Sequence, residues 1–190
     1  VPGQILFVGT LTARKNVGGL LDAYSALLER RPDAPPLVLA GLARPEAEPW
    51  LARLRRPPLA GRARHLGYVA DRERRALYLG ATMLVLPSFD EGFGLPVLEA
   101  MALGVPVVAS TSGALPDLAG EAALLVDPGR PDEIALAMAL LLSDPDRAAA
   151  LGAAGRRRSA AYSWQRSAAL VRQAYAEACS RRRRSRHDRR

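Results

Sequence analysis

The sequence predicts an α/β protein with a doubly wound, mainly six-stranded parallel sheet and helices on both faces. Short apolar runs alternate with amphipathic stretches over most of the chain. The runs are apolar throughout, which is typical of strands that helices cover on both sides. A chain of 190 residues with 49% hydrophobic residues is also large enough to bury one good core.

The expected elements follow one another in a regular order. Runs of buried-strand length lie at residues 5–8, 36–40, 64–66, 83–86, 105–109 and 123–126. The amphipathic stretches between them predict helices near residues 17–30, 46–55, 72–79, 96–103 and 132–142. After Asp144 the pattern is wholly helical, with C-terminal helices at about 146–153 and 164–178 and a break at Gly152 and Gly155. Residues 181–190 are rich in arginine and are predicted to be disordered.

The most informative segment is residues 90–101, Asp-Glu-Gly-Phe-Gly-Leu-Pro-Val-Leu-Glu-Ala-Met. It joins a predicted strand to a predicted helix, and Pro96 suits the first position of that helix. The first N–H groups of a helix lack intrahelical partners, and the helix dipole is positive there. Gly92 and Gly94 let the backbone approach a ligand closely. Together these features predict an anion site, most often one for phosphate.

The two glutamates of this segment need a role other than phosphate binding. Glu99 lies about one helical turn in, where it can accept hydrogen bonds from a ribose diol. Glu91 precedes the helix and can accept from hydroxyls attached beyond the phosphates. Phosphate, ribose and a further polyol together describe a nucleotide sugar. The competing interpretation is a structural corner with a capping glutamate and packing glycines.

Lys15 is the only lysine among the 27 basic residues of the chain. It follows a predicted strand and precedes a predicted helix, where a phosphate ligand is expected. In a chain that otherwise uses arginine, a lone lysine indicates that this position favours a compact ammonium group. By position alone, a solvated loop lysine is an equally good interpretation.

Composition excludes several other classes of protein. Seven arginines and one aspartate in residues 181–190 supply +6 of the net charge of +8, which leaves +2 elsewhere. No basic stripe with interleaved aromatic residues indicates a specific nucleic-acid partner. There is no apolar run of membrane-span length and no signal-peptide pattern, so we expect a cytoplasmic protein. No group of His, Cys, Asp and Glu has metal-ligand spacing, so no metal and no cofactor are predicted.

The segment Glu-Gly-Phe-Gly-Leu-Pro-Val-Leu-Glu-Ala-Met-Ala at residues 91–102 resembles the signature of retaining glycosyltransferases of the GT-B fold, in the large family-4 group. The likeness runs from about Gln4 to Ala178. Further matching segments lie at residues 7–16 (with Arg14-Lys15-Asn16 as the phosphate loop), 67–71, 104–109, 114–128 and 162–164.

This resemblance implies an enzyme with two Rossmann-like domains. The chain resembles only the donor-binding domain, at residues 1–180, and the N-terminal acceptor-binding domain is absent from it. The implied reaction moves a hexose from a GDP- or UDP-linked donor, such as GDP-mannose, to an acceptor with retention of configuration and without a metal. A glycan or a lipid-linked glycan is the implied class of acceptor, and the full-length enzyme is cytoplasmic or peripheral to a membrane.

The resemblance also assigns roles to individual residues. Glu91 is implied to act at the reacting sugar as the catalytic residue, and Glu99 to hold the ribose. The implied donor-binding residues are Lys15 for the diphosphate, Val69 for the base through its backbone, and Phe93, Gly94 and Leu95 for the sugar and phosphates through theirs.

Two departures from the family pattern leave the choice of sugar open. Thr10 stands where many relatives have an arginine, so either Arg14 substitutes as a donor-binding residue or the site carries less positive charge. Asp117 stands where many have glutamate. Two alternative functions remain at this level. One is a nucleotide-sugar epimerase of the same fold, and the other is a non-catalytic nucleotide-binding or scaffold domain.

Overall fold

Six strands form one parallel sheet in the computed structural model, which describes residues 3–187, with side chains described as far as residue 178. The order across the sheet is β3-β2-β1-β4-β5-β6, and each neighbouring pair is parallel. This is the doubly wound order, so the predicted fold class is confirmed. The strands are β1 (Gln4–Val8), β2 (Leu37–Ala40), β3 (Ala63–His65), β4 (Ala81–Leu86), β5 (Val107–Ser110) and β6 (Leu124–Val126).

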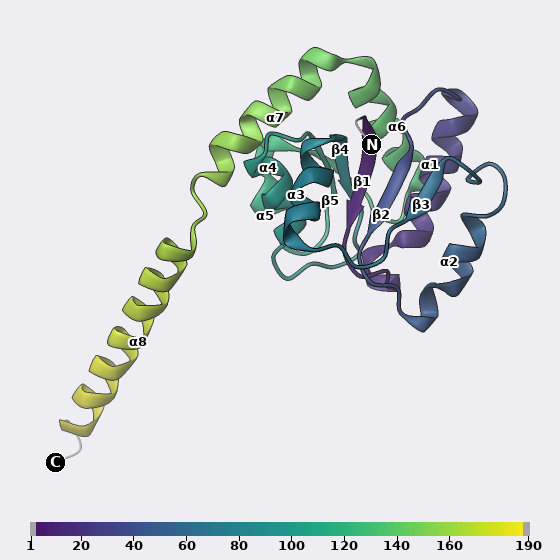
Figure 1. The fold of residues 1–190 in the computed structure, drawn as a ribbon. Helices are drawn as coiled ribbons and strands as arrows, with labels where there is room; N and C mark the ends of the chain where they lie inside the picture. The colour runs from purple at the N-terminus through teal and green to yellow at the C-terminus, as the bar shows by residue number, and fades with distance from the viewer. Residues whose placement is uncertain (1–2, 188–190) are drawn as a thin grey trace. The chain divides into compact units, whose positions relative to one another are not determined.

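Helices cover both faces of the sheet (Figure 1). On one side α1 (Val17–Arg30) packs against α6 (Pro131–Ser143), with α2 (Glu48–Arg53) beside α1. The other side carries α3 (Asp71–Leu79), α4 (Leu95–Ala102) and α5 (Leu115–Ala119), and α7 (Pro145–Ser159) packs on α4. Short 3-10 turns η1, η2 and η3 lie at Ala13–Lys15, Pro45–Ala47 and Gly120–Ala122.

Helix α1, which connects β1 to β2, shows how the sequence forms the helix layer on that face of the sheet. Helix α1 buries an apolar face with helical spacing, formed by Val17, Leu20, Leu21, Ala23, Tyr24, Leu27 and Leu28. Its N-cap is Asn16, which has a left-handed backbone (φ 55°) and accepts from the Gly19 N–H at 3.2 Å. The Asn16 amide also donates to the Pro128 carbonyl at 2.6 Å. The turn that carries Lys15 is therefore attached both to α1 and to the loop after β6.

Two glycines predicted to break a helix instead lie inside α7. A Cβ atom at Gly152 would stand 2.3 Å from the Gly104 carbonyl oxygen, and one at Gly155 would stand 3.0 Å from Cγ of Met101. These positions are glycine because α7 approaches α4 and its C-terminal turn too closely for a side chain. The prediction of a break was wrong because the sequence does not distinguish a glycine that permits close helix packing from one that ends a helix.

The structure differs from the sequence prediction at two other places. Residues 115–119 form α5, although the sequence indicated a loop there. Helix α8 (Trp164–His187) continues into the segment predicted to be disordered, as the high helix propensity of arginine allows; residues 188–190 lie outside the described residues. The chain divides after Ser159 into two units, and α8 belongs to the second. Within residues 3–187, no helix combines the length and apolar character needed to cross a membrane.

The close approach at Gly152 leads to a prediction of stability. At an ordinary helix position, Gly→Ala gains about 1 kcal/mol from propensity. We expect Gly152→Ala to lose about 1–3 kcal/mol of unfolding free energy instead, because the methyl group would overlap the Gly104 carbonyl. Urea denaturation measures the change. The exposed neighbour Ala153 provides the control, since Ala153→Gly should lose only the propensity difference. A gain of stability in Gly152→Ala would contradict this close packing.

Candidate functional site

The loops after β1 and β4 come together at the carboxyl edge of the sheet, because these two strands are neighbours at its centre. From this point the chain winds outward to β2 and β3 on one side and to β5 and β6 on the other. Doubly wound proteins bind their ligands outside the strand ends at such a switch point. Here η1, with Lys15, follows β1, and the loop with Glu91 follows β4 and leads into α4.

Lys15 and Glu91 form a buried ion pair between these two loops. The Lys15 ammonium donates a hydrogen bond to Oε1 of Glu91, and the two side chains are 10% and 7% exposed. The fully buried hydroxyl of Ser88 donates to the same oxygen at 2.7 Å. A buried charge pair is tolerated when hydrogen bonds satisfy it in this way. The pair therefore holds Lys15 in one place, directly above the end of β1.

Arg14 adds a second positive charge to this cluster. Its Nη1 lies 3.4 Å from Oε2 of Glu91 and donates to the Asp90 carbonyl at 2.5 Å. The Arg14 carbonyl in turn accepts from the Phe89 N–H at 2.9 Å, so the two loops are also joined through the backbone. The Arg14 side chain is 51% exposed, which leaves its guanidinium open to a ligand.

The surroundings of Glu91 keep its carboxyl group ionised. Burial alone would raise the pKa of Glu91, but the hydrogen bonds from Lys15 and Ser88 and the charges of Lys15 and Arg14 together lower it below its ordinary value. The charge of Lys15 is thus balanced inside the protein, and Arg14 supplies the exposed positive charge. Oε1 of Glu91 is occupied by two donors, whereas Oε2 faces only Arg14 at a longer distance.

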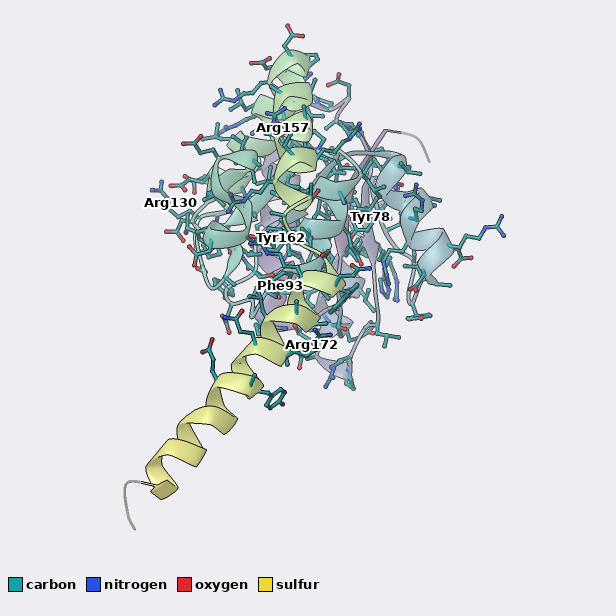
Figure 2. All side chains as sticks on the ribbon, turned by 90° about the vertical axis from the view of Figure 1, so that its left-hand side faces the viewer. Tyr78, Phe93, Arg130, Arg157, Tyr162 and Arg172 are labelled. Carbon is teal, nitrogen blue, oxygen red and sulfur yellow. The ribbon has the colours of Figure 1, made fainter. Side chains whose placement is uncertain are left out.

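Helix α4 begins at this edge with a glycine in the left-handed conformation. Gly94 is the N-cap (φ 92°), and a Cβ atom there would stand 2.4 Å from Cδ2 of Leu115 on α5. Glycine is required both by the backbone angle and by this contact. The first-turn N–H groups of α4 point to the same edge, where the helix dipole favours an anion. Phe93, labelled in Figure 2, and Leu95 flank this end and are 43% and 48% exposed.

Glu99 turns toward α3, away from Lys15. Its Oε2 accepts from the Tyr78 hydroxyl at 2.8 Å, and its Oε1 lies 3.4 Å from Nη2 of Arg74. These three side chains line a pocket of about 240 Å³ between α3 and α4, together with Asp71, Arg75, Ala102 and Leu103. The Glu99 side chain is 37% exposed and lines the pocket.

The two remaining predicted residues lie at the same edge of the sheet. Thr10 follows Gly9 at the end of β1, and Val69 lies in the loop between β3 and α3. Both are half-buried, and among the described residues neither forms a side-chain hydrogen bond with the Lys15–Glu91 cluster. The structure therefore brings Arg14, Lys15 and Glu91 into contact, and it places Glu99 in a separate group with α3.

Three residues that touch the predicted glutamates were missed by the sequence analysis. Ser88 stands three residues before Glu91, a Ser-x-x-Glu spacing whose side chains often interact locally. That spacing could have indicated the contact between Ser88 and Glu91. Tyr78 resembled an ordinary core residue and Arg74 a surface charge, and no sequence signal connects either to Glu99. In the part of the chain that the structure describes, no group of three His, Cys, Asp or Glu side chains could hold a metal ion.

The sequence matches the model of the family Glycosyl transferases group 1 over residues 2–158. It is 39% identical over 163 residues to the O-antigen chain mannosyltransferase B of Escherichia coli, a match that covers 86% of this chain and 43% of that protein. The chain also resembles MMP alpha-(1->4)-mannosyltransferase of Mycolicibacterium hassiacum, at 43% identity over 60% of this chain and 28% of the relative. It thus spans less than half the length of these relatives.

Solved structures agree with this match. Sucrose-phosphate synthase from Thermosynechococcus elongatus superimposes with a TM-score of 0.82 at 30% identity, over 94% of this chain and 46% of that one. The C-terminal domain of a glycosyl transferase group 1 family protein from Francisella tularensis gives a TM-score of 0.76 at 28% identity, over 85% of this chain and 87% of that one. The family match, the sequence identity and the shared GT-B fold together show that this chain belongs to the Glycosyl transferases group 1 family.

Proposed function

We propose that the chain is the donor-binding half of a retaining glycosyltransferase. The enzyme moves a hexose from a GDP- or UDP-linked sugar to an acceptor such as a glycan or a lipid-linked glycan. The observation that carries this proposal is the arrangement at the strand ends. The Arg14–Lys15–Glu91 cluster, with one net positive charge, and a helix N-terminus suit a diphosphate, and the Glu99 carboxylate in a neighbouring pocket suits a ribose. The mannosyltransferase names of two relatives support a hexose donor.

The diphosphate would lie between η1 and the start of α4. Arg14 supplies exposed positive charge there, and Lys15 is held beside it by Glu91. Thr10 and the backbone at Phe93, Gly94 and Leu95 are the further groups that would bind the donor. During transfer the bond between the anomeric carbon and the diphosphate oxygen breaks, and the diphosphate gains negative charge. The cations and the helix dipole stabilise that charge without a metal ion. The acceptor hydroxyl then bonds through its oxygen to the same face of the sugar and passes its proton to the leaving diphosphate oxygen, so the configuration is retained.

Glu91 is the proposed catalytic carboxylate at the reacting sugar. A carboxylate has about four acceptor positions, and Lys15 and Ser88 occupy those of Oε1. Oε2 is therefore the oxygen that would accept from a sugar hydroxyl. Because Glu91 also fixes Lys15, the same residue would align the sugar with the phosphate that leaves.

The nucleoside would extend toward α3. Glu99 can accept from both hydroxyls of a ribose with the lone pairs that Tyr78 and Arg74 leave open. Val69, in the loop before α3, would contact the base through its backbone. The acceptor would be held by a second domain in the full-length enzyme, since the relatives are more than twice as long as their matched portion. We propose a cytoplasmic or membrane-peripheral site of action.

Removing the lysine should weaken diphosphate binding selectively. Lys15→Ala should cost about 1.5–3 kcal/mol of binding free energy for GDP or UDP, the usual value of a charge-assisted hydrogen bond. Binding of the nucleoside should change little. Calorimetric titration with UDP, GDP and ADP in the presence of a chelator measures both.

Arg53→Ala serves as the control, because Arg53 pairs with Asp22 away from the site. Thermal melting of both variants checks folding, since Lys15→Ala leaves Glu91 with fewer donors. An equal loss for nucleoside and diphosphate would place Lys15 elsewhere, and binding that needs Mg²⁺ or Mn²⁺ would exclude the metal-free proposal.

Changing the second glutamate should alter recognition of the ribose. The wild-type chain should prefer GDP or UDP over the 2′-deoxy form, because the Glu99 carboxylate can accept from both hydroxyls. Glu99→Gln should reduce this preference, since an amide offers only one acceptor oxygen. The ratio of the two dissociation constants measures it. Glu121→Gln, on an exposed turn, is the control. Equal wild-type binding of both forms would show that Glu99 is not the ribose ligand.

This chain alone should transfer no sugar at an appreciable rate. Holding donor and acceptor in reacting geometry can supply roughly 7–11 kcal/mol of the barrier, and the acceptor side belongs to the second domain. Adding that domain, in the same chain or in trans, should restore transfer in an assay with a radiolabelled donor. In that complete enzyme, Glu91→Ala should abolish transfer and retain nucleotide binding. Robust transfer by the 190-residue chain would contradict the two-domain mechanism.

A further inference from the structure

Glu99 needs an external support if it is to recognise a ribose. It projects from α4 on a side chain that has three rotatable bonds and is 37% exposed. A free glutamate of this kind loses rotamer entropy when it binds, which lowers affinity and selectivity. Ribose binding by Glu99 is part of the function proposed above, on which this inference rests.

Tyr78 supplies such a support from the opposite helix. It lies on α3, labelled in Figure 2, and only 2% of it is exposed. Its hydroxyl donates to Oε2 of Glu99 at 2.8 Å. Burial, and then the charge of the Glu99 carboxylate, raise the pKa of Tyr78 well above its ordinary value. The hydroxyl therefore remains protonated and acts as a donor at any pH at which the protein is studied.

The position of the contact explains why it can orient the carboxylate without blocking it. The rigid Tyr78 ring is held by the core, so the hydroxyl marks a fixed point for Oε2. The longer contact from Arg74, at 3.4 Å, approaches the other oxygen. Each oxygen of Glu99 thus faces one of these donors, and a carboxylate has about four acceptor positions, so positions remain for a ligand in the pocket that Glu99 lines. The contact from Tyr78 therefore orients the carboxylate without filling it.

We propose that Tyr78 is a positioning residue for ribose recognition: its hydroxyl holds the Glu99 carboxylate in the orientation that accepts from the ribose diol. The alternative is a buried hydroxyl that has merely found an acceptor. Tyr24 shows what that arrangement looks like in this protein. Its hydroxyl shares one proton between the carbonyl oxygens of Pro35 and Arg62, at 2.9 and 3.2 Å, and among the described residues it has no hydrogen bond to a proposed site residue. Tyr78 instead depends on the side chain of a proposed ligand-binding residue.

The two buried tyrosines provide a matched test. Tyr78→Phe and Tyr24→Phe each remove one buried hydroxyl and retain the ring, so thermal melting should show that both fold. Calorimetry then measures the ribose preference, the ratio of dissociation constants for GDP and 2′-deoxy-GDP, and for the UDP pair. We expect Tyr78→Phe to reduce this ratio by about fivefold, equivalent to one hydrogen bond of about 1 kcal/mol. Tyr24→Phe should leave the ratio unchanged.

A double-mutant comparison tests whether Tyr78 acts through Glu99. In a Glu99→Ala background, Tyr78→Phe should change the ratio no further, because the group that it orients is gone. Inorganic pyrophosphate, which lacks a ribose, should bind the wild type and Tyr78→Phe equally. A simple packing defect would weaken every ligand together and would act in both backgrounds.

The outcomes separate this inference from the function on which it rests. If the wild type binds the ribose and deoxyribose forms equally, the proposed role of Glu99 is wrong and the role of Tyr78 is wrong with it. If the wild type prefers ribose and Glu99→Gln reduces that preference while Tyr78→Phe does not, the role of Glu99 stands and Tyr78 has only a structural role. An equal change in Tyr24→Phe would also contradict the proposal.

Discussion

The pairing of β1 with β4 is the constraint on which the rest of the site depends. These strands are about 75 residues apart in the chain, yet Ile5 lies opposite Met83 and Leu6 opposite Leu84. All four side chains are fully buried between the two helix layers, so a shift of register would require the close-packed core to repack and is strongly disfavoured. Because the strands are parallel, their following loops emerge side by side. Lys15 and Glu91 meet for this reason, although the sequence of neither loop indicates that the two loops are in contact.

Burial of the ion pair at this junction costs free energy, and a turn with only a structural role would not require such a pair. Taking a carboxylate and an ammonium out of water costs several kcal/mol for each ion, and an apolar pair of similar volume is often at least as stable. The hydroxyl of Ser88 and the approach of Arg14 offset part of this cost, and the pKa of Glu91 is lowered as a result. An arrangement of this kind is easier to understand where fixed charges must be in place before a ligand arrives. The ligand-free protein then has little reorganisation to undergo.

The two glutamates differ in how they are supported, and the difference suits the roles proposed for them. Glu91 is enclosed by cations and by a local hydroxyl, so its charge is neutralised and its position is set within the loops of the site. Glu99 is held mainly by a neutral hydroxyl from another helix, with Arg74 at a longer distance, and it keeps a larger exposed fraction. A carboxylate that is more exposed and less closely paired with cations is the better acceptor for two vicinal hydroxyls. An ionised carboxylate whose charge is balanced by neighbouring cations is better suited to lie beside the charged diphosphate without repelling it.

Local pattern determined much of this protein by itself. Apolar runs specified the parallel strands other than β3, which contains Arg64 and His65. The glycines, proline and glutamates of residues 90–101 specified the corner at α4. Both signals depend on the conformational preferences of neighbouring residues. What pattern could not supply were contacts between distant segments. The sequence at Gly152 indicates a helix end, but the glycine permits close contact with the Gly104 carbonyl. The sequence at Tyr78 indicates an ordinary core residue, but its hydroxyl donates to Glu99. The meeting of Lys15 with Glu91, and the separate grouping of Glu99 with α3, were likewise decided only by tertiary structure. The physical reason is that strand order and helix packing set these distances, and neither is encoded within any one segment of the chain.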